Sequence, residues 1–235
     1  MPHDASDRPT TGSTTPTDPP AQYRPKSLLL RWLTFLLGVW VMSVGIALSL
    51  HGQLGTAPIS TFPAVIDAAS PLSVGFVTGV MNIVFVLLQM LILRRRFKAL
   101  QLLQLPIAVV FGTLVDLSFY LTSWIQPEHY VTKWVVTIIG AIILGLGVYI
   151  QIQPKLIYLP GEGLVMALTK VTTVRYGTMK QIVDWSLVII AAVVSLILLQ
   201  RLEGVREGTV FAAFAVGAVV KTLERWRTRD SSDAT

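Results

Sequence analysis

The residues of this chain that could do chemistry are polar groups set inside long apolar runs. Lys180 and Asp184 share one run at a spacing of four, which places them on one face of a helix and lets them form an ion pair. Asn82 lies near the middle of an earlier run. Because a charge buried in hydrocarbon is costly, these three residues are candidates for binding a solute or a proton. A purely structural Lys180–Asp184 pair near the membrane interface is the alternative.

Two turn-rich segments, 54–58 and 160–163, supply further candidates. Each precedes a short helical pattern, and the free N–H groups at a helix start attract anions. Thr56 and Ser60 add hydroxyl groups to the first start, and Glu162 adds a carboxylate to the second. Two such starts at one depth would bind an anion or the carboxylate of a zwitterion. Alternatively, Thr56 caps the first helix and Glu162 stabilises the dipole of the second.

The sequence lacks the residues that thiol chemistry, metal binding and the common enzyme motifs require. The absence of cysteine excludes disulfides and thiol catalysis. There is no H-E-x-x-H, G-x-S-x-G, Walker or G-x-G-x-x-G motif, and the three histidines lack metal-ligand spacing. The net charge of +6 is spread over the connections between apolar runs, which argues against nucleic-acid binding. We therefore expect no enzyme activity, no cofactor, no metal and no nucleic-acid partner.

Long apolar runs are the elements that must position these groups. Hydrophobic residues make up 53% of the chain and charged residues 14%. A membrane-spanning helix needs about 20 mostly apolar residues. Six segments qualify, at 28–50, 73–93, 99–121, 133–152, 178–200 and 207–225. The fold class is therefore expected to be all-α, a polytopic membrane protein, with a kink at Pro106 inside the third helix.

Two further segments, 54–70 and 159–172, show helical patterns too short to cross a bilayer. Apolar residues fall on one face of each, namely Ile59, Phe62, Val65 and Ile66 in the first and Leu164, Val165, Leu168 and Val171 in the second. Such segments are either re-entrant half-helices or amphipathic helices that lie on the membrane surface. We expect Gln89, in the second long run, to form hydrogen bonds between helices.

The chain contains an internal repeat, in which residues 31–120 return in diverged form as 133–225. Four pairs of segments show it at an offset of 102 or 105, namely Gly38 and Gly45 with Gly140 and Gly147, 75–82 with 177–184, 54–58 with 159–163, and Gly112 with Gly217. Asn82 and Asp184 are mates, as are Asp116, expected at a membrane interface, and Lys221. Each copy has three long apolar runs, so the second copy must enter the bilayer from the opposite side. This 3+3 inverted repeat is typical of secondary transporters.

The distribution of Lys and Arg predicts the orientation in the membrane. Fourteen of them flank one set of run ends and three flank the other, which places both termini in the cytoplasm. Residues 1–26 hold six of the thirteen prolines and read as a disordered cytoplasmic tail. Residues 27–226 form the transmembrane domain, and 227–235 form a second cytoplasmic tail.

The two turn segments and the Lys180–Asp184 spacing resemble the YczE/YyaS/YitT group of bacterial membrane proteins, most closely its YczE branch. The likeness covers about residues 28–226. It implies a multi-pass protein of the bacterial cytoplasmic membrane and implies no substrate.

Two functions are consistent with these features. The first is a secondary transporter or exporter of a small polar or anionic solute, bound near Thr56, Ser60, Asn82, Glu162, Lys180 and Asp184. The second is a membrane accessory or regulatory protein that assembles with a partner. Gly140, Gly145 and Gly147 form a small-residue face on segment 133–152, which predicts a packing seam within the chain or a homodimer. The lipid bilayer is the expected surrounding in both cases.

Overall fold

The computed structural model describes residues 27–232, and every regular element in that range is helical. The α-helices are α1 (Leu28–His51), α2 (Pro58–Ala69), α3 (Val74–Leu93), α4 (Gln104–Leu121), α5 (Tyr130–Ile152), α6 (Pro160–Val171), α7 (Tyr176–Leu199) and α8 (Glu207–Ser232). Two 3-10 segments, Arg94–Arg96 and Ala99–Leu103, join α3 to α4. The all-helical prediction is confirmed for these residues. The tail predicted at 1–26 lies outside them.

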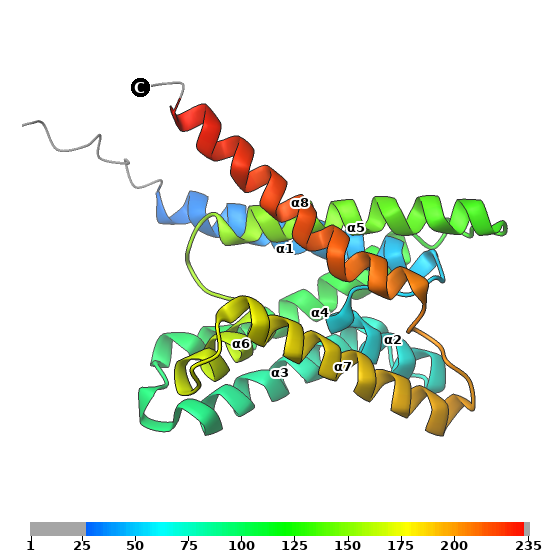
Figure 1. Ribbon diagram of the computed structural model, residues 1–235, viewed down its shortest axis with the longest axis horizontal. Coiled ribbons are helices and arrows are strands. Elements are labelled where there is room, and N and C mark those ends of the chain that lie inside the picture. Colours follow the sequence, from blue (N-terminus) through cyan, green and yellow to red (C-terminus); the bar gives the residue numbers. More distant parts are fainter. Residues whose placement is uncertain (1–26, 233–235) are drawn as a thin grey trace, which may run out of the picture.

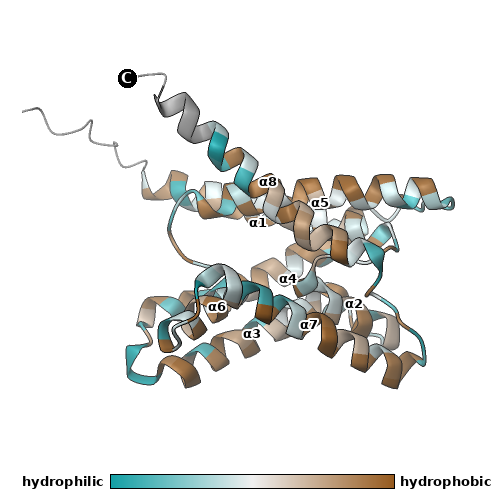
Figure 2. Ribbon diagram, in the orientation of Figure 1, coloured by the Kyte–Doolittle hydropathy of each residue, from teal (hydrophilic) through white to brown (hydrophobic). Residues whose placement is uncertain are grey.

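Five of these elements are long and apolar enough to cross a membrane: α1, α3 with the 3-10 turn after it, the segment 99–121 that contains α4, α5 and α7. Their outer surfaces are apolar too, and Figure 2 shows hydrophilic residues mainly at helix ends and connections. Leu29 is 69% exposed and Ile197 66% exposed. A water-soluble monomer rarely exposes so much apolar surface. The chain is therefore a membrane protein.

The sixth predicted span, α8, is a helix of 26 residues, but its apolar stretch is shorter than in the other five. Its uncharged part runs for 13 residues, from Gly208 to Val220, before Lys221. Thirteen helical residues cover about 20 Å, whereas the hydrocarbon core is about 30 Å thick. A full crossing by α8 requires the long basic side chains beyond Val220 to reach back to the headgroups. The helix also continues past the predicted end at residue 225.

Helices α1 and α5 lie side by side and run in opposite directions (Figure 1). Glycines allow their backbones to touch, since a Cβ atom at any of four positions would collide with the other helix. The colliding pairs are Gly38 with Gln151, Gly45 with Leu144, Gly140 with Ser49 and Gly147 with Met42. An offset of 102 converts the first pair into the third and the second into the fourth. Positions that the sequence predicts to be repeat mates thus make the same contact from both sides.

The remaining glycine of the small-residue face, Gly145, is also covered, because its Cβ would lie 2.8 Å from Val219 of α8. All three glycines of this face therefore pack within the chain.

The other helices pack in matching pairs around this seam. Helix α2 packs against α7 and α6 against α3, while α4 packs on α1 and α8 on α5 (Figure 1). Apolar side chains from α1, α4 and α5, such as Phe35, Phe111 and Leu144, form the main core. This core of α1, α4 and α5 forms one wall of a space that α6 and α7 border on the other side.

The kink expected at Pro106 is not found. Helix α4 begins at Gln104, after a 3-10 segment, so Pro106 lies in its first turn. The amide that proline lacks has no partner inside a first turn anyway, so the helix loses no hydrogen bond.

Candidate functional site

A cavity of about 1630 Å³ is lined by α6 and α7, by the end of α5 and the middle of α8, by the start of α2, and by residues of α1, α3 and α4. Four of its lining residues are exposed lysines, namely Lys98, Lys155, Lys170 and Lys221. All four belong to the ends that carry fourteen of the flanking Lys and Arg residues. The cavity therefore opens toward the Lys- and Arg-rich side of the protein.

The starts of the two short helices meet at this cavity, as expected from the sequence. Pro58 and Pro160 are the first residues of α2 and α6, and each fits a first turn without losing a hydrogen bond. A Cβ atom on Gly161 would collide with the side chain of Ile59. Two positive helix ends thus lie next to one wall of the cavity.

Gln89 anchors the start of α6. Its Nε2 donates to Gln104 Oε1 at 2.9 Å and to the Pro160 carbonyl at 3.1 Å. Gly163 packs directly on it, because a Cβ there would lie 2.6 Å from Gln89 Oε1. The interhelical hydrogen bond predicted for Gln89 is confirmed, and it ties α3, α4 and α6 together.

Thr56 and Ser60, two of the predicted site residues, do not line the cavity. Both are buried, with Thr56 fully covered. The turn that holds Thr56 depends on Gly55, whose φ of +101° is costly for a residue with a side chain. The N-cap of α2 is Ala57, so the alternative that Thr56 caps this helix is wrong.

Glu162 lies in the first turn of α6 and lines the cavity. Its Oε2 atom is buried and has no hydrogen-bond partner among the described residues, and α6 has no side-chain cap. Glu162 lies outside the five candidate spans, and burial raises the pKa of its carboxyl, while the charge of Lys180 opposes that shift. The carboxylate thus stands unpaired in a poorly solvated place.

Lys180 and Asp184 form the ion pair that their spacing predicts. Lys180 Nζ lies 2.6 Å from each oxygen of Asp184. Both side chains line the cavity, at 37% and 22% exposure. Because each charge faces its opposite, the pair adds no net charge to the cavity.

Asn82, the repeat mate of Asp184, also lines the cavity. Its Nδ2 donates to the Thr78 carbonyl one turn earlier, at 2.9 Å. Four of the six predicted site residues, Asn82, Glu162, Lys180 and Asp184, therefore share one cavity. No group of three His, Cys, Asp or Glu residues in the described part of the chain is placed to hold a metal ion.

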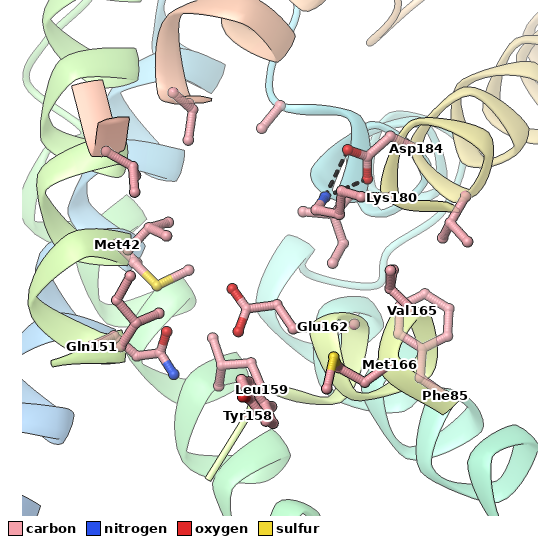
Figure 3. Close-up of a pocket in the computed structure, with 18 of the residues that line it drawn as sticks. Met42, Phe85, Gln151, Tyr158, Leu159, Glu162, Val165, Met166, Lys180 and Asp184 are labelled. Carbon is pink, nitrogen blue, oxygen red and sulfur yellow. Dashed lines mark hydrogen bonds and ion pairs between the residues drawn. The ribbon is translucent and has the colours of Figure 1, made fainter. Parts of the chain in front are cut away.

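Sequence reasoning missed Gln151, Tyr158 and Tyr176, which also line the cavity. Gln151 is 1% exposed, and neither its Nε2 nor its Oε1 has a partner among the described residues. Figure 3 shows the Gln151 amide and the Glu162 carboxylate pointing into the same space. One signal was available, because Gln151 is an amide at the end of a long apolar run.

The seam between α3 and α4 is closed. A Cβ on Gly112 would lie 2.5 Å from the carbonyl oxygen of Gly75, so the two backbones touch. Asp116 of α4 then caps α3, accepting from the Gly75 amide at 2.7 Å and from Ser73 Oγ at 2.6 Å. The sequence placed Asp116 at an interface and did not predict this capping role.

The equivalent seam between α7 and α8 is open. Gly177 and Gly217 are the repeat mates of Gly75 and Gly112, yet a Cβ on either would meet no atom within 4 Å. Gly217 and Lys221 line the cavity instead. The same pair of glycines therefore packs in one repeat and stands apart in the other.

Comparison with known proteins identifies the family of this chain. A family model matches residues 29–225, a range that includes every helix around the cavity. The chain belongs to DUF6198, a family of unknown function. This DUF6198 protein is similar to the uncharacterized protein YyaS of Bacillus subtilis (strain 168), at 23% identity over 138 residues, or 58% of this chain and 67% of YyaS. No solved structure matches it. The YyaS part of the predicted resemblance is supported, and the YczE branch and YitT stay predictions.

Proposed function

We propose that this protein is a secondary transporter or exporter of a small polar solute in the bacterial cytoplasmic membrane. One observation carries the proposal: Gly75 and Gly112 touch, while their mates Gly177 and Gly217 stand apart beside a cavity. Transporters built from inverted repeats work by exchanging two such arrangements around a fixed site. A protein that only holds a partner does not require one seam to be closed while the equivalent seam is open.

The proposed topology has six crossings, made by α1, α3 and α4 in one repeat and by α5, α7 and α8 in the other. The antiparallel contact of α1 with α5, which repeats at an offset of 102, supports it. Helices α2 and α6 are proposed to be re-entrant, since each buries half of its residues within the bundle. Both termini then lie in the cytoplasm, on the Lys- and Arg-rich side.

In this topology the structure corresponds to the state whose cavity opens to the cytoplasm. The cavity opens beside α7 and α8, and the closed α3–α4 seam blocks the way to the outside. In the opposite state the α7–α8 seam closes and the α3–α4 seam opens. Glu162 and Asp184 are the carboxylates that take up a proton and couple solute movement to the proton gradient.

Replacing Asp184 with asparagine is expected to reduce transport by about tenfold or more. The variant loses the carboxylate that pairs with Lys180, and a hydrogen bond to a charged group is worth about 1.5–3 kcal/mol, while 1.4 kcal/mol corresponds to tenfold. The measurement uses purified protein in vesicles that enclose a pH-sensitive dye. Solutes from a panel of amines, carboxylates and neutral compounds are added outside, and proton movement is recorded.

The matched control is Glu203→Gln, which removes the carboxylate of the exposed Arg201–Glu203 pair between α7 and α8. Surface pairs contribute little, so this variant should transport normally. If Asp184→Asn transports like the wild type at equal protein level, the role of Asp184 is wrong. If no solute moves protons and a partner protein co-purifies in fixed proportion, the accessory function replaces the transporter.

A further inference from the structure

The cavity contains polar atoms that the protein itself leaves without partners. Glu162 Oε2 and both amide atoms of Gln151 are buried and have no hydrogen-bond partner in the range that the structure describes. They come from α6 and α5, and they point toward one space (Figure 3). Buried polar groups are normally satisfied, so such a cluster indicates that a ligand completes it.

The charge of this cluster is negative. The ion pair satisfies Lys180 and Asp184, which leaves Glu162 as the carboxylate of this cluster without an ion-pair partner. No ion pair joins Glu162 to Lys180 among the described residues. A buried carboxylate without a partner is strongly unfavourable, and a cation that donates hydrogen bonds removes that cost. The exposed lysines lie at the open end and do not pair with it.

Most of the lining around this cluster is apolar. Met42, Phe85, Leu159 and Val165 surround it, and all four appear with Glu162 in Figure 3. Cavities of this kind hold an apolar ligand body and use a few polar groups to orient it. The volume of about 1630 Å³ exceeds the 300–1,000 Å³ that is typical of small-molecule sites, so it has room for a ligand with a bulky apolar part.

We propose that the cavity binds an amphipathic primary amine, whose ammonium group donates hydrogen bonds to Glu162 Oε2 and Gln151 Oε1 while its apolar body lies against the cavity walls. The inference rests on the proposed function, because it names the substrate class of the same site. It also narrows the expected solute, since an anion bound at this cluster would face the Glu162 carboxylate.

The test is thermal unfolding of the purified full chain with three probes of similar shape: phenylbutylammonium, phenylbutanol and phenylbutanoate. At about a hundredfold excess over the dissociation constant, the amine should raise the melting temperature by about 5 °C or more. The alcohol and the carboxylate should cause no comparable rise. Equal stabilisation by the alcohol, or a larger one by the carboxylate, would overturn the proposal.

Variants assign the effect to the cluster. Glu162→Gln keeps the shape of the side chain and removes its charge, so the amine should no longer raise the melting temperature. The control is Glu128→Gln, the same change at an exposed carboxylate between α4 and α5, which should respond like the wild type. A wild-type response from Glu162→Gln would overturn the proposal.

A second measurement needs no variant and covers the case in which Glu162→Gln fails to fold. Dicyclohexylcarbodiimide labels carboxyl groups in apolar surroundings, and peptide mass spectrometry locates the label. Phenylbutylammonium should protect Glu162 from labelling, and phenylbutanol should not. Equal labelling with and without the amine would contradict the proposal.

A free amine and the headgroup of phosphatidylethanolamine both carry a primary ammonium group, so either could be the ligand of this site. Melting curves in micelles that contain either phosphatidylethanolamine or phosphatidylcholine separate the two sources. If phosphatidylethanolamine stabilises the protein and removes the response to phenylbutylammonium, the lipid is the ligand. If neither lipid changes the response, the ligand is a free amine.

Vesicle uptake of the amine separates this inference from the proposed function. Binding without uptake would contradict transport and leave the amine site standing. Proton-coupled movement of a carboxylate, with no binding of the amine, would support transport and contradict the amine site.

Amine binding is also expected to weaken as the pH falls. Because burial raises the pKa of Glu162, its carboxylate is present above that raised pKa and is lost as the pH falls through it. An alkylamine stays protonated from about pH 8 to about pH 5. The other titratable groups that line the cavity are Lys98, Lys155, Tyr158, Lys170, Tyr176, Lys180, Asp184, Lys221 and Glu224. The melting shift with phenylbutylammonium should therefore shrink as the pH falls through the raised pKa of Glu162, and a melting shift that grows as the pH falls would contradict the role of the carboxylate.

Discussion

Replacing Gly217 with leucine is expected to stop transport while leaving the protein folded. A Cβ atom at this position meets no atom within 4 Å in the described arrangement, and the position lines the cavity, so the larger leucine side chain has open space to occupy. In the opposite state of the proposed cycle, however, Gly217 must approach Gly177 as closely as Gly112 approaches Gly75. A leucine side chain would keep α7 and α8 apart and hold the protein open on one side.

Two measurements check this result together. Vesicle transport should fall by about tenfold or more, the equivalent of about 1.4 kcal/mol, whereas the melting temperature in detergent should stay close to that of the wild type. The control is Ala218→Leu on the neighbouring exposed position of α8, which does not line the cavity and should transport normally. Normal transport by Gly217→Leu would exclude closure of the α7–α8 seam.

The absence of cysteine makes a direct test of the two seams possible. A single cysteine at position 217 should react with a membrane-impermeant maleimide, because the position lines the open cavity. A cysteine at position 79 is the control from the closed side, where the nearest atom to a Cβ is the Ala108 carbonyl oxygen at 3.6 Å. An amine that drives the cycle should lower reactivity at 217 and raise it at 79.

Replacing Gly147 with alanine is expected to destabilise the whole fold. Its Cβ would collide with the backbone of Met42, and a backbone atom cannot move aside as a flexible side chain can. The α1–α5 seam would have to separate along its length. Overpacking typically costs about 1–3 kcal/mol, and a collision with backbone atoms belongs at the upper end, about 3 kcal/mol. The melting temperature should fall by about 6–12 °C, since 1 kcal/mol corresponds to about 2–4 °C for a protein of this size.

Gly217→Ala is the matched control, because it makes the same change in a helix at a position with open space. Alanine is favoured over glycine in a helix by about 0.5–1 kcal/mol, so this variant should be as stable as the wild type or slightly more stable. Equal melting temperatures for Gly147→Ala and Gly217→Ala would show that the α1–α5 contact is not tight.

Much of the local structure could be predicted because it depends on short-range rules. The spacing of Lys180 and Asp184 produced the ion pair, and Pro58 and Pro160 began the two short helices. The hydrogen bonds of Gln89 were expected because an amide in an apolar run needs a partner.

The errors came where distant segments decide the environment of a residue. Thr56 was offered as a helix cap, but the N-cap of α2 is Ala57, and the chain packs Thr56 away from the cavity. Gln151 became part of the site because the end of α5 faces the start of α6. The local sequence marks Gln151 as an amide in an apolar run, but it does not show which helix it faces. Pro106 was expected to kink a helix that in fact begins only two residues before it.

By itself the sequence determined that the chain is helical and lies in a membrane, because apolar runs of about 20 residues have no other stable surroundings. It also predicted which residues are repeat mates. Only the tertiary structure decided which of two equivalent seams is closed and which polar groups are left without a partner. Predicted mates such as Gly112 and Gly217 are both glycine, so the sequence cannot distinguish them. They differ only in which atoms pack against them.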